Sequence, residues 1–493
     1  MSTQLNFLLN QGLRYIHGGN LDGAELILKQ IIKVQPSHSE ALRLLGVIAI
    51  QKNDYQLALH RLDGSLTSNR RNWIAYSNKG NVLLILGDAE GAIKAHKKAI
   101  EINPQYAEAY NNLGNALLSI YEFQQAIDNF RLALKFEPNN YDFKINLGNA
   151  YFSGNFYDEA INAYMQVLEI DPHNASAHFY LAQIYLLKMQ FDFGWDEYEW
   201  RWLSKENSSK LLISSKELWH GQPFEGVLYI WAEQGIGDQI LYASLFSELR
   251  NLPQKKIISV ENKLIPIFER SFTDFKFIEK EATLPECQYD YHVPLSSLGR
   301  FFRKSKNDFI GAANNYLIAN KEIARSPRGY KSLCEKKLCG ISWKSSNKSL
   351  GAQKSIALMD LSEILKLENV EFVNLQYGDI STEVAHVNKA LDIKIDSVQD
   401  VDLYEDMDGA LGLIDACDII LTTSNSTAHL AGALGKEVLL LLPFSVGRFW
   451  YWHDIDGISL WYPSVRVFKQ EQQGDWSKPI QAAKAYLENR FGI

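Results

Sequence analysis

One loop places a carboxylate between a strand and a helix, a position where catalytic groups are often found. Residues 227–231 form an apolar run that predicts a strand, followed by Ala232-Glu233-Gln234-Gly235-Ile236-Gly237-Asp238. The glycines permit a tight turn into a helix predicted over 239–249, and Asp238 stands where that helix begins. Asp238 is either a general base at the mouth of a cleft or a capping residue for the helix amides. Position 240 is isoleucine instead of the third glycine of the dinucleotide fingerprint, which disfavours a dehydrogenase.

A second polar segment has the composition of an anion site. It runs Thr422-Thr423-Ser424-Asn425-Ser426-Thr427-Ala428-His429, after a strand predicted over 419–422 and at the start of a helix predicted over 427–434. Free N–H groups at a helix start bind phosphate, and ordinary capping needs only one or two such side chains. We therefore expect Ser424, Asn425, Ser426 and Thr427 to bind a diphosphate. His429 either contacts a phosphate or sugar, or is a hydrogen-bonded core residue.

Further candidates follow strands predicted over 338–343 and 370–375. Trp343 ends the first and Lys344 follows it, where Lys344 either neutralises phosphate charge or is solvated. Gln376 follows the second and either contacts a base or ribose or is merely exposed. Two Asp-x-Asp segments, at 406–408 and 454–456, fit a metal-dependent glycosyltransferase, but matches by chance are expected among 58 acidic residues. We interpret both as solvated loops and expect no metal site and no cofactor.

The part of the chain that precedes these loops is periodic. Small residues recur at a constant interval in two series: Gly12, Gly46, Gly80, Gly114, Gly148, Ala182; and Ala24, Ala58, Ala92, Ala126, Ala160, Gly194. The interval resembles that of the tetratricopeptide repeat, a pair of helices of about 34 residues with small residues where the helices touch. Such pairs must stack to bury their apolar faces, so residues 1–203 predict a superhelix of about six repeats with a concave groove.

Asparagines recur at two positions of the repeat, three residues apart and hence on one helix face. They are Asn78, Asn112 and Asn146, and Asn81, Asn115 and Asn149. A stacked double row of amides would hold an extended peptide by its backbone, because an amide both donates and accepts hydrogen bonds. Alternatively, these side chains join neighbouring helices or face water. The arrangement resembles the asparagine ladder of the O-linked N-acetylglucosamine transferases.

After a polar linker over 204–218, strands alternate with helices, which predicts parallel sheets covered by helices. We assign residues 219–325 and 326–493 to two α/β halves. The 493 residues are 46% hydrophobic and 22% charged with net charge −8, which is typical of a soluble globular chain. This charge disfavours nucleic acid, and no apolar run approaches the ~20 residues of a membrane span. The start lacks a secretory pattern and the four cysteines form no CxxC pair, so we expect a cytoplasmic protein.

The α/β part also resembles a known family. The segments that carry this resemblance are Trp231–Ile240, Pro294–Leu298, Gly340–Trp343, Asn374–Gln376, Ala428–Gly435, Trp461–Pro463 and Gly474–Trp476. With the repeats, they resemble bacterial tetratricopeptide-repeat proteins with a heptosyltransferase-like glycosyltransferase domain. The resemblance implies the GT-B fold: two facing Rossmann-like halves, the first for the acceptor and the second for a nucleotide-sugar. It also implies that Asp238 is the base and that Lys344 and residues 424–429 hold the donor.

The sequence thus predicts an all-α repeat superhelix followed by an α/β GT-B unit that moves a sugar, without metal, to a Ser or Thr of a protein held in the groove. One departure is that Ser424-Asn425 replaces the family's common Asp-Thr. Two alternatives therefore stay open: a scaffold that has lost catalysis, or a transferase acting on a glycan or lipid. The sugar, the nucleotide, the acceptor and self-association are not predicted.

Overall fold

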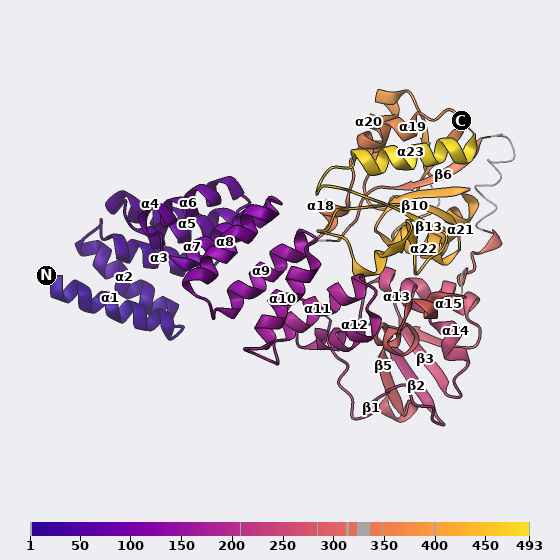
Figure 1. Cartoon of the computed structure of the whole chain (residues 1–493), viewed down its shortest axis with the longest axis horizontal. Coiled ribbons are helices and arrows are strands. Elements are labelled where there is room, and N and C mark those ends of the chain that lie inside the picture. Colours follow the sequence, from indigo (N-terminus) through magenta and orange to yellow (C-terminus); the bar gives the residue numbers. More distant parts are fainter. Residues whose placement is uncertain are drawn as a thin grey trace. The chain divides into compact units, whose positions relative to one another are not determined.

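The computed structural model describes residues 2–207, 209–282, 284–311, 315–322, 336–347, 349–398 and 401–492. The chain forms two compact units, Met1–Ala177 and His178–Ile493. Figure 1 shows paired helices in the first and sheets with covering helices in the second. The predicted boundary between the α/β halves, at residues 325 and 326, lies outside the described residues.

The first unit is a stack of helix pairs. Its helices are α1 (Ser2–His17), α2 (Leu21–Val34), α3 (Ser39–Gln51), α4 (Tyr55–Ser68), α5 (Trp73–Ile85), α6 (Ala89–Ile102), α7 (Ala107–Ser119), α8 (Phe123–Phe136), α9 (Tyr141–Ser153) and α10 (Tyr157–Leu168). The second helix of the first three pairs starts at a capping side chain, Asn20, Asp54 or Asp88, which accepts a backbone N–H three residues on. The all-helical superhelix predicted for this part is confirmed.

The small residues set how closely the two helices of a pair approach. Each glycine of the first series faces a larger side chain on the second helix of its own pair: Gly12 and Leu28, Gly46 and Leu62, Gly80 and His96, Gly114 and Phe130, Gly148 and Tyr164. A Cβ at any of these glycines would stand within 3.0 Å of that side chain. The predicted role of the small residues, to let helices touch, is therefore confirmed.

The second unit begins with α11 (Ala175–Leu187, shared with the first unit), α12 (Phe191–Tyr198) and the 3₁₀ turn η1 (Glu199–Trp202). The last predicted repeat is thus part of the α/β core. Trp195 is buried, donates from Nε1 to the Arg303 carbonyl at 2.7 Å, and fills the space where Gly299 has no side chain. Residues 204–216 run without helix or strand where they are described.

The first sheet has the strand order β1-β5-β2-β3-β4, and all its pairings are parallel. Its elements are β1 (Glu217–Leu218), β2 (Val227–Trp231), β3 (Lys255–Val260), β4 (Lys276–Glu279) and β5 (Tyr291–Pro294), with α13 (Ile236–Ala243), α14 (Phe246–Arg250), α15 (Ile265–Ser271) and α16 (Gly299–Phe302). The single helix predicted over 239–249 is two helices, α13 and α14, separated at Ser244 and Leu245.

The second sheet is mixed, with the order β11-β12-β13-β10-β9-β6-β7-β8. Its strands are β6 (Lys337–Ser342), β7 (Val370–Asn374), β8 (Ile395–Asp396), β9 (Ile419–Thr423), β10 (Glu437–Leu442), β11 (Asp454–Ile455), β12 (Ile458–Ser459) and β13 (Val465–Lys469). Its helices are α18 (Gly351–Lys354), α19 (Ser362–Leu365), α20 (Ser381–Leu391), α21 (Met407–Ala416), α22 (Ser426–Ala433) and α23 (Ser477–Phe491). The neighbouring strands β8-β7-β6-β9-β10-β13 are all parallel, and in this direction they have the 3-2-1-4-5-6 order of doubly wound folds. Strands β12 and β11 continue the sheet beyond β13 with antiparallel pairing.

Candidate functional site

Both sheets have a point where the strand order reverses, between β2 and β5 in the first and between β6 and β9 in the second. Ligands of open α/β sheets bind outside the carboxyl ends of the strands at this point. The loop with Asp238 follows β2, and residues 424–429 follow β9. The topology therefore puts both predicted segments at binding positions.

Asp238 is the third residue of α13, and the helix itself is capped by Gly235. The Asp238 carboxylate accepts the backbone N–H of Gly235, as the third helical residue does in a capping box. Its capping role is thus real but uses only part of the carboxylate, which also lines a cavity. Both interpretations of Asp238 are compatible with this geometry.

The cavity has a volume of about 280 Å³ and is lined from both sheets. Helix α13, which follows β2 of the first sheet, contributes Gly237 and Asp238, while α22 contributes Ser426 and His429 and α18 contributes Lys354. α13 and α22 pack against each other: a Cβ on Gly237 would lie 2.8 Å from Cδ2 of His429. Glycine at this position is what permits the approach.

A carboxylate and a buried ammonium shape the charge of this cavity. Burial, and then the negative charge of Glu233, raise the pKa of Asp238 to about 6, with Lys354 opposing. Burial lowers the pKa of Lys354 to about 8, with Asp238 opposing. The Lys354 residue is only 4% exposed, and its Nζ lies 4.5 Å from the centroid of the Phe449 ring. Perturbed groups of this kind gather at functional sites.

Lys354 was not anticipated from the sequence, because no motif surrounds it and its helix has only four residues. The lysine that was anticipated, Lys344, pairs through Nζ with Glu383 at 2.5 Å. Trp343 is buried and donates from Nε1 to the same carboxylate at 3.2 Å. Gln376 is also engaged within the protein: its Oε1 accepts the backbone N–H groups of Trp343 and Lys344 and the hydroxyl of Ser342. These three residues support the end of β6.

Asn425 and Ser424 are held by protein groups. Asn425 is the capping residue of α22, accepts the N–H of Ala428 at 3.3 Å, and donates from Nδ2 to the Ser342 hydroxyl at 2.7 Å. Ser424 accepts the indole N–H of Trp452 at 2.8 Å. For these two side chains the structure shows the capping and packing role that was the alternative to ligand binding.

The next two residues differ. The N–H groups of Ser426 and Thr427 have no acceptor among the described residues, because the capping bond reaches only Ala428. Ser426 lines the cavity, whereas the Thr427 side chain is buried. His429 is buried at 2% exposure, and burial, with a smaller effect of Lys354, lowers its pKa to about 3. Its Nδ1 lies 3.0 Å from the Tyr462 hydroxyl.

A buried ionic network contacts the loop before Asp238 through Glu233. Arg201, with no exposed side-chain surface, bonds Glu199 at 2.9 Å and the Ser297 hydroxyl at 2.8 Å, and lies 3.4 Å from Glu233. Glu233 is 1% exposed and also accepts the Ser296 hydroxyl. The signals were visible, a charged residue in the aromatic run at 199–202 and a carboxylate in the loop, but their pairing was not predicted.

The asparagines of the repeats divide into two groups. Asn112 donates to the Ser77 hydroxyl at 3.3 Å and Asn146 to Asn111 at 2.9 Å, so both join neighbouring helix pairs. Asn149 accepts the Tyr164 hydroxyl at 2.6 Å. Asn78 has a buried Nδ2 without a partner, and the side chains of Asn81 and Asn115, both half-buried, make no hydrogen bond with the described residues.

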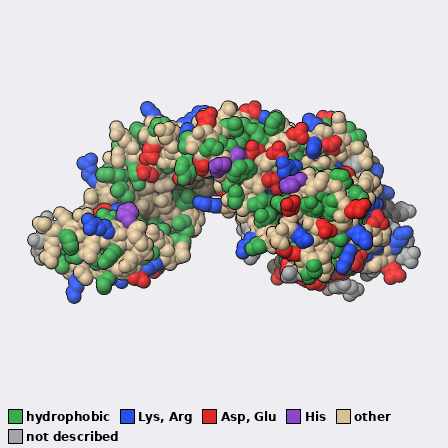
Figure 2. Space-filling model, turned by 90° about the horizontal axis from the view of Figure 1, so that it is seen from below, with side chains coloured by type: hydrophobic (Ala, Val, Ile, Leu, Met, Phe, Trp, Pro, Cys, Tyr) green, Lys and Arg blue, Asp and Glu red, His purple; other side chains and the backbone are tan. Residues whose placement is uncertain are grey.

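In the part of the chain that the structure describes, no three His, Cys, Asp or Glu side chains are grouped so as to hold a metal ion. Asp406 caps α21 and Asp408 pairs with Arg270, so this Asp-x-Asp segment is not the solvated loop expected. Figure 2 shows acidic and basic side chains interspersed over the face in view. None of the described helices combines the length and the hydropathy that crossing a bilayer requires.

Comparison with known families identifies the first part of the chain. Models described as "TPR repeat" and "Tetratricopeptide repeat" match residues 80–120 and 148–188, 9–61, and 107–140. The helical part of the chain therefore contains tetratricopeptide repeats, as the period of the small residues predicted. These repeats indicate a protein-interaction scaffold.

Relatives extend this finding. Protein FlbA of Caulobacter vibrioides is 28% identical over 336 residues, 61% of this chain and 53% of FlbA. TPR repeat-containing protein MJ1428 of Methanocaldococcus jannaschii is 35% identical over 97 residues, 20% of this chain and 17% of that protein. Among solved structures, a crystal structure of MamA is 25% identical, covering 36% of this chain and 96% of MamA, with a TM-score of 0.31. This chain thus spans about half of FlbA. Because 61% of this chain is more than the predicted repeats at 1–203 contain, the FlbA alignment includes part of the α/β region.

Proposed function

We propose that this chain is a glycosyltransferase of GT-B type whose repeats bind the protein that receives the sugar. The observation that carries the proposal is the cavity in which Asp238, Lys354 and the first turn of α22 meet at the points where the strand order of the two sheets reverses. A carboxylate with a pKa of about 6 is suited to take a proton near neutral pH. A lysine and free helix amides are suited to an anion.

In the proposed step, Asp238 accepts the proton of an acceptor hydroxyl as its oxygen attacks the anomeric carbon of the donor. The bond from that carbon to the diphosphate breaks, and the diphosphate leaves with the bonding electrons. Lys354 and the N–H groups of Ser426 and Thr427 stabilise the charge that develops on the leaving oxygen. Lys354 takes the role expected of Lys344, because the Lys344 ammonium is already paired with Glu383. The expected independence from metal remains a prediction.

The donor nucleoside has space beside the diphosphate. A larger cavity of about 1050 Å³ lies along β7, β8 and α20, and Tyr377 lines both this cavity and the smaller one. We assign the nucleoside to the larger cavity and the diphosphate to the smaller. Such a division matches the amount of space each group needs.

For the acceptor, Asn81 and Asn115 are the asparagines we assign to a peptide backbone. Neither is engaged by a described residue, and they occupy equivalent positions in adjacent repeats. Asn112 and Asn146 instead stabilise the stack. The proposed peptide site therefore contains fewer asparagines than the double row expected from the sequence.

The test uses the full chain. A panel of nucleotide-sugars is first screened by thermal shift. Donor hydrolysis and sugar transfer are then measured as the release of nucleotide. Asp238→Asn should lower turnover by about 10²–10⁴-fold while donor binding persists, the range for loss of a general base. Asp392→Asn is the matched control, because Asp392 is exposed with φ 54°, a conformation that asparagine adopts readily. Full turnover by Asp238→Asn would refute the mechanism.

A second candidate is a scaffold that binds nucleotide without turnover. It is favoured by Ser424, which stands where a carboxylate is common in the similar family and instead accepts the indole N–H of Trp452. This candidate predicts thermal stabilisation by a nucleoside diphosphate and no release of nucleotide from any sugar donor. An acceptor that is a glycan or lipid predicts instead that Asn81→Ala/Asn115→Ala leaves transfer unchanged.

A further inference from the structure

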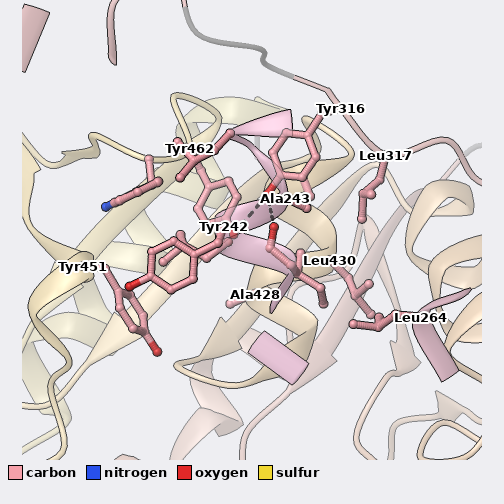
Figure 3. Close-up of a cluster of buried hydrophobic side chains, with 14 of the residues drawn as sticks. Tyr242, Ala243, Leu264, Tyr316, Leu317, Ala428, Leu430, Tyr451 and Tyr462 are labelled. Carbon is pink, nitrogen blue, oxygen red and sulfur yellow. Dashed lines mark hydrogen bonds between the residues drawn. The ribbon is translucent and has the colours of Figure 1, made fainter. Parts of the chain in front are cut away.

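A chain of hydroxyls reaches His429 from the side opposite the cavity. Tyr316, Tyr462 and Tyr242 lie in one cluster of buried side chains (Figure 3). The Tyr316 hydroxyl donates to the carbonyl of Ile240 in α13 at 2.7 Å. It lies 3.5 Å from the Tyr462 hydroxyl, which lies 3.0 Å from Nδ1 of His429. The chain thus connects α13 to the imidazole on α22.

The protons along this chain can be assigned by counting donors. The single proton of Tyr316 is used on the Ile240 carbonyl, so Tyr316 can only accept from Tyr462. The proton of Tyr462 therefore goes either to Tyr316 or to His429. The distance to Nδ1 is 3.0 Å against 3.5 Å to Tyr316, so the bond to Nδ1 is the stronger. His429 then accepts at Nδ1 and carries its proton on Nε2.

The second nitrogen of His429 faces the cavity. Nε2 makes no hydrogen bond within the described residues. It is also not fully enclosed by protein, so it keeps some accessible surface. His429 lines the same cavity as Asp238, and the missing side chain of Gly237 leaves room beside Nε2. Because burial keeps the pKa of His429 at about 3, the ring is neutral near pH 7 and has one N–H to offer.

We propose that Tyr462 is a positioning residue that holds His429 in the tautomer with its proton on Nε2, so that the imidazole donates a hydrogen bond to an oxygen of the ligand in the cavity. The ligand oxygen belongs to the diphosphate or to the donor sugar; its identity rests on the proposed function, but the tautomer does not. Tyr462 acts only through His429 and touches no ligand. Tyr316 completes the arrangement by occupying the other side of the Tyr462 hydroxyl.

The tautomer is tested by nitrogen NMR on the full chain labelled with ¹⁵N-histidine. The His429 signals are assigned by their loss in His429→Gln. We expect a protonated Nε2 and a hydrogen-bonded, unprotonated Nδ1, and in Tyr462→Phe an Nδ1 resonance shifted toward the value of a free acceptor. Tyr486→Phe is the control, since the Tyr486 hydroxyl bonds Glu437 and leaves the His429 signals unchanged. A proton on Nδ1 of the unmodified protein would overturn the proposal.

Ligand binding and turnover provide the second readout. Tyr462→Phe should lower kcat about tenfold, the effect of one ordinary hydrogen bond, with a smaller change in KM. Thermal shifts with a nucleoside diphosphate and with a nucleotide-sugar separate the two oxygens, since a weakened shift with both indicates the diphosphate and with the nucleotide-sugar alone the sugar. If the unmodified protein transfers no sugar, the proposed function fails while the NMR result still decides the tautomer. A Tyr462→Phe variant with altered Nδ1 but unchanged binding and turnover would refute the role of the tautomer.

Discussion

His96 gives a prediction that depends only on the repeat structure. It stands in α6 at the position held by Leu28, Leu62, Phe130 and Tyr164 in the other pairs, packed against Gly80. The ring has no exposed surface, and neither of its nitrogens has a hydrogen-bond partner. A polar ring therefore occupies an apolar core position, and a charged ring there would be strongly disfavoured.

The change in the free energy of unfolding with pH follows from the shift in the pKa of His96. Burial lowers the pKa of His96 from an ordinary 6.5 to about 4. Between these values the unfolded chain binds a proton that the folded chain does not, so the free energy of unfolding decreases as the pH falls. The full loss is about 3 kcal/mol below pH 4, and about 2 kcal/mol of it arises between pH 7 and pH 5. His96→Phe removes this contribution and the unpaired nitrogens, and phenylalanine already fills the equivalent position at 130.

The assay is urea unfolding of the full chain at pH 7 and pH 5. Unfolding is monitored by hydrogen exchange in peptides from α5 and α6. Every other histidine is present in both proteins, so the difference between the parent and His96→Phe isolates His96. We expect His96→Phe to gain stability relative to the parent at both pH values, and about 2 kcal/mol more at pH 5. His60→Phe, the same substitution at an exposed histidine, is the control. A gain for His96→Phe that is equal at both pH values would refute the reasoning.

Further predictions concern the candidate site. Transfer should increase as the pH rises through about 6, where Asp238 loses its proton, and decrease above about 8, where Lys354 loses its charge; a flat pH–rate profile would contradict this pairing. Gly237→Ala should lower transfer and disturb His429, because the new Cβ would lie 2.8 Å from the imidazole, whereas Gly235→Ala, with no heavy atom nearer than 3.6 Å, should have little effect. Lys354→Met should weaken binding of a nucleoside diphosphate, measured by calorimetry, far more than binding of the nucleoside, and Lys344→Met should weaken it less; the reverse order would restore the role first expected of Lys344. Arg201→Met should destabilise the α/β unit by about 3–5 kcal/mol in urea unfolding, since it leaves Glu233 buried without its cation, and Arg201→Met/Glu233→Gln should recover part of that loss.

Periodic features of the chain were predictable because they depend on local geometry. The regular spacing of small residues follows from where two helices of a pair touch, and each glycine does face a larger side chain. The strands at 227–231, 370–374 and 419–423 were likewise visible as short apolar runs followed by polar loops. A strand's carboxyl end identifies where a ligand can bind, so the loops at 238 and 424–429 could be selected without a structure.

Pairings between distant residues were not predictable in this way. Lys344 and Lys354 lie close together in the sequence and have the same side chain, yet only Lys354 is buried in the cavity wall. What separates them is Glu383 on α20, which takes the Lys344 ammonium. The choice depends on where α20 packs, which no spacing in the sequence encodes. The same holds for Arg201 and Glu233, whose contact requires η1 to fold into the α/β core.

The asparagine rows show how one repeated residue can serve two purposes. Asn112 and Asn146 reach back to Ser77 and Asn111, so equivalent positions fix the distance between successive helix pairs. The side chains of Asn81 on α5 and Asn115 on α7, at the repeat position three residues further on, remain without a partner among the described residues. Amides that join the pairs hold the free amides of adjacent repeats in register, and a peptide backbone can use a row of amides only if their spacing is fixed. Loss of Asn112 should therefore weaken peptide binding indirectly, by loosening the register of Asn81 and Asn115, whereas loss of Asn115 should weaken it without changing the stability of the stack.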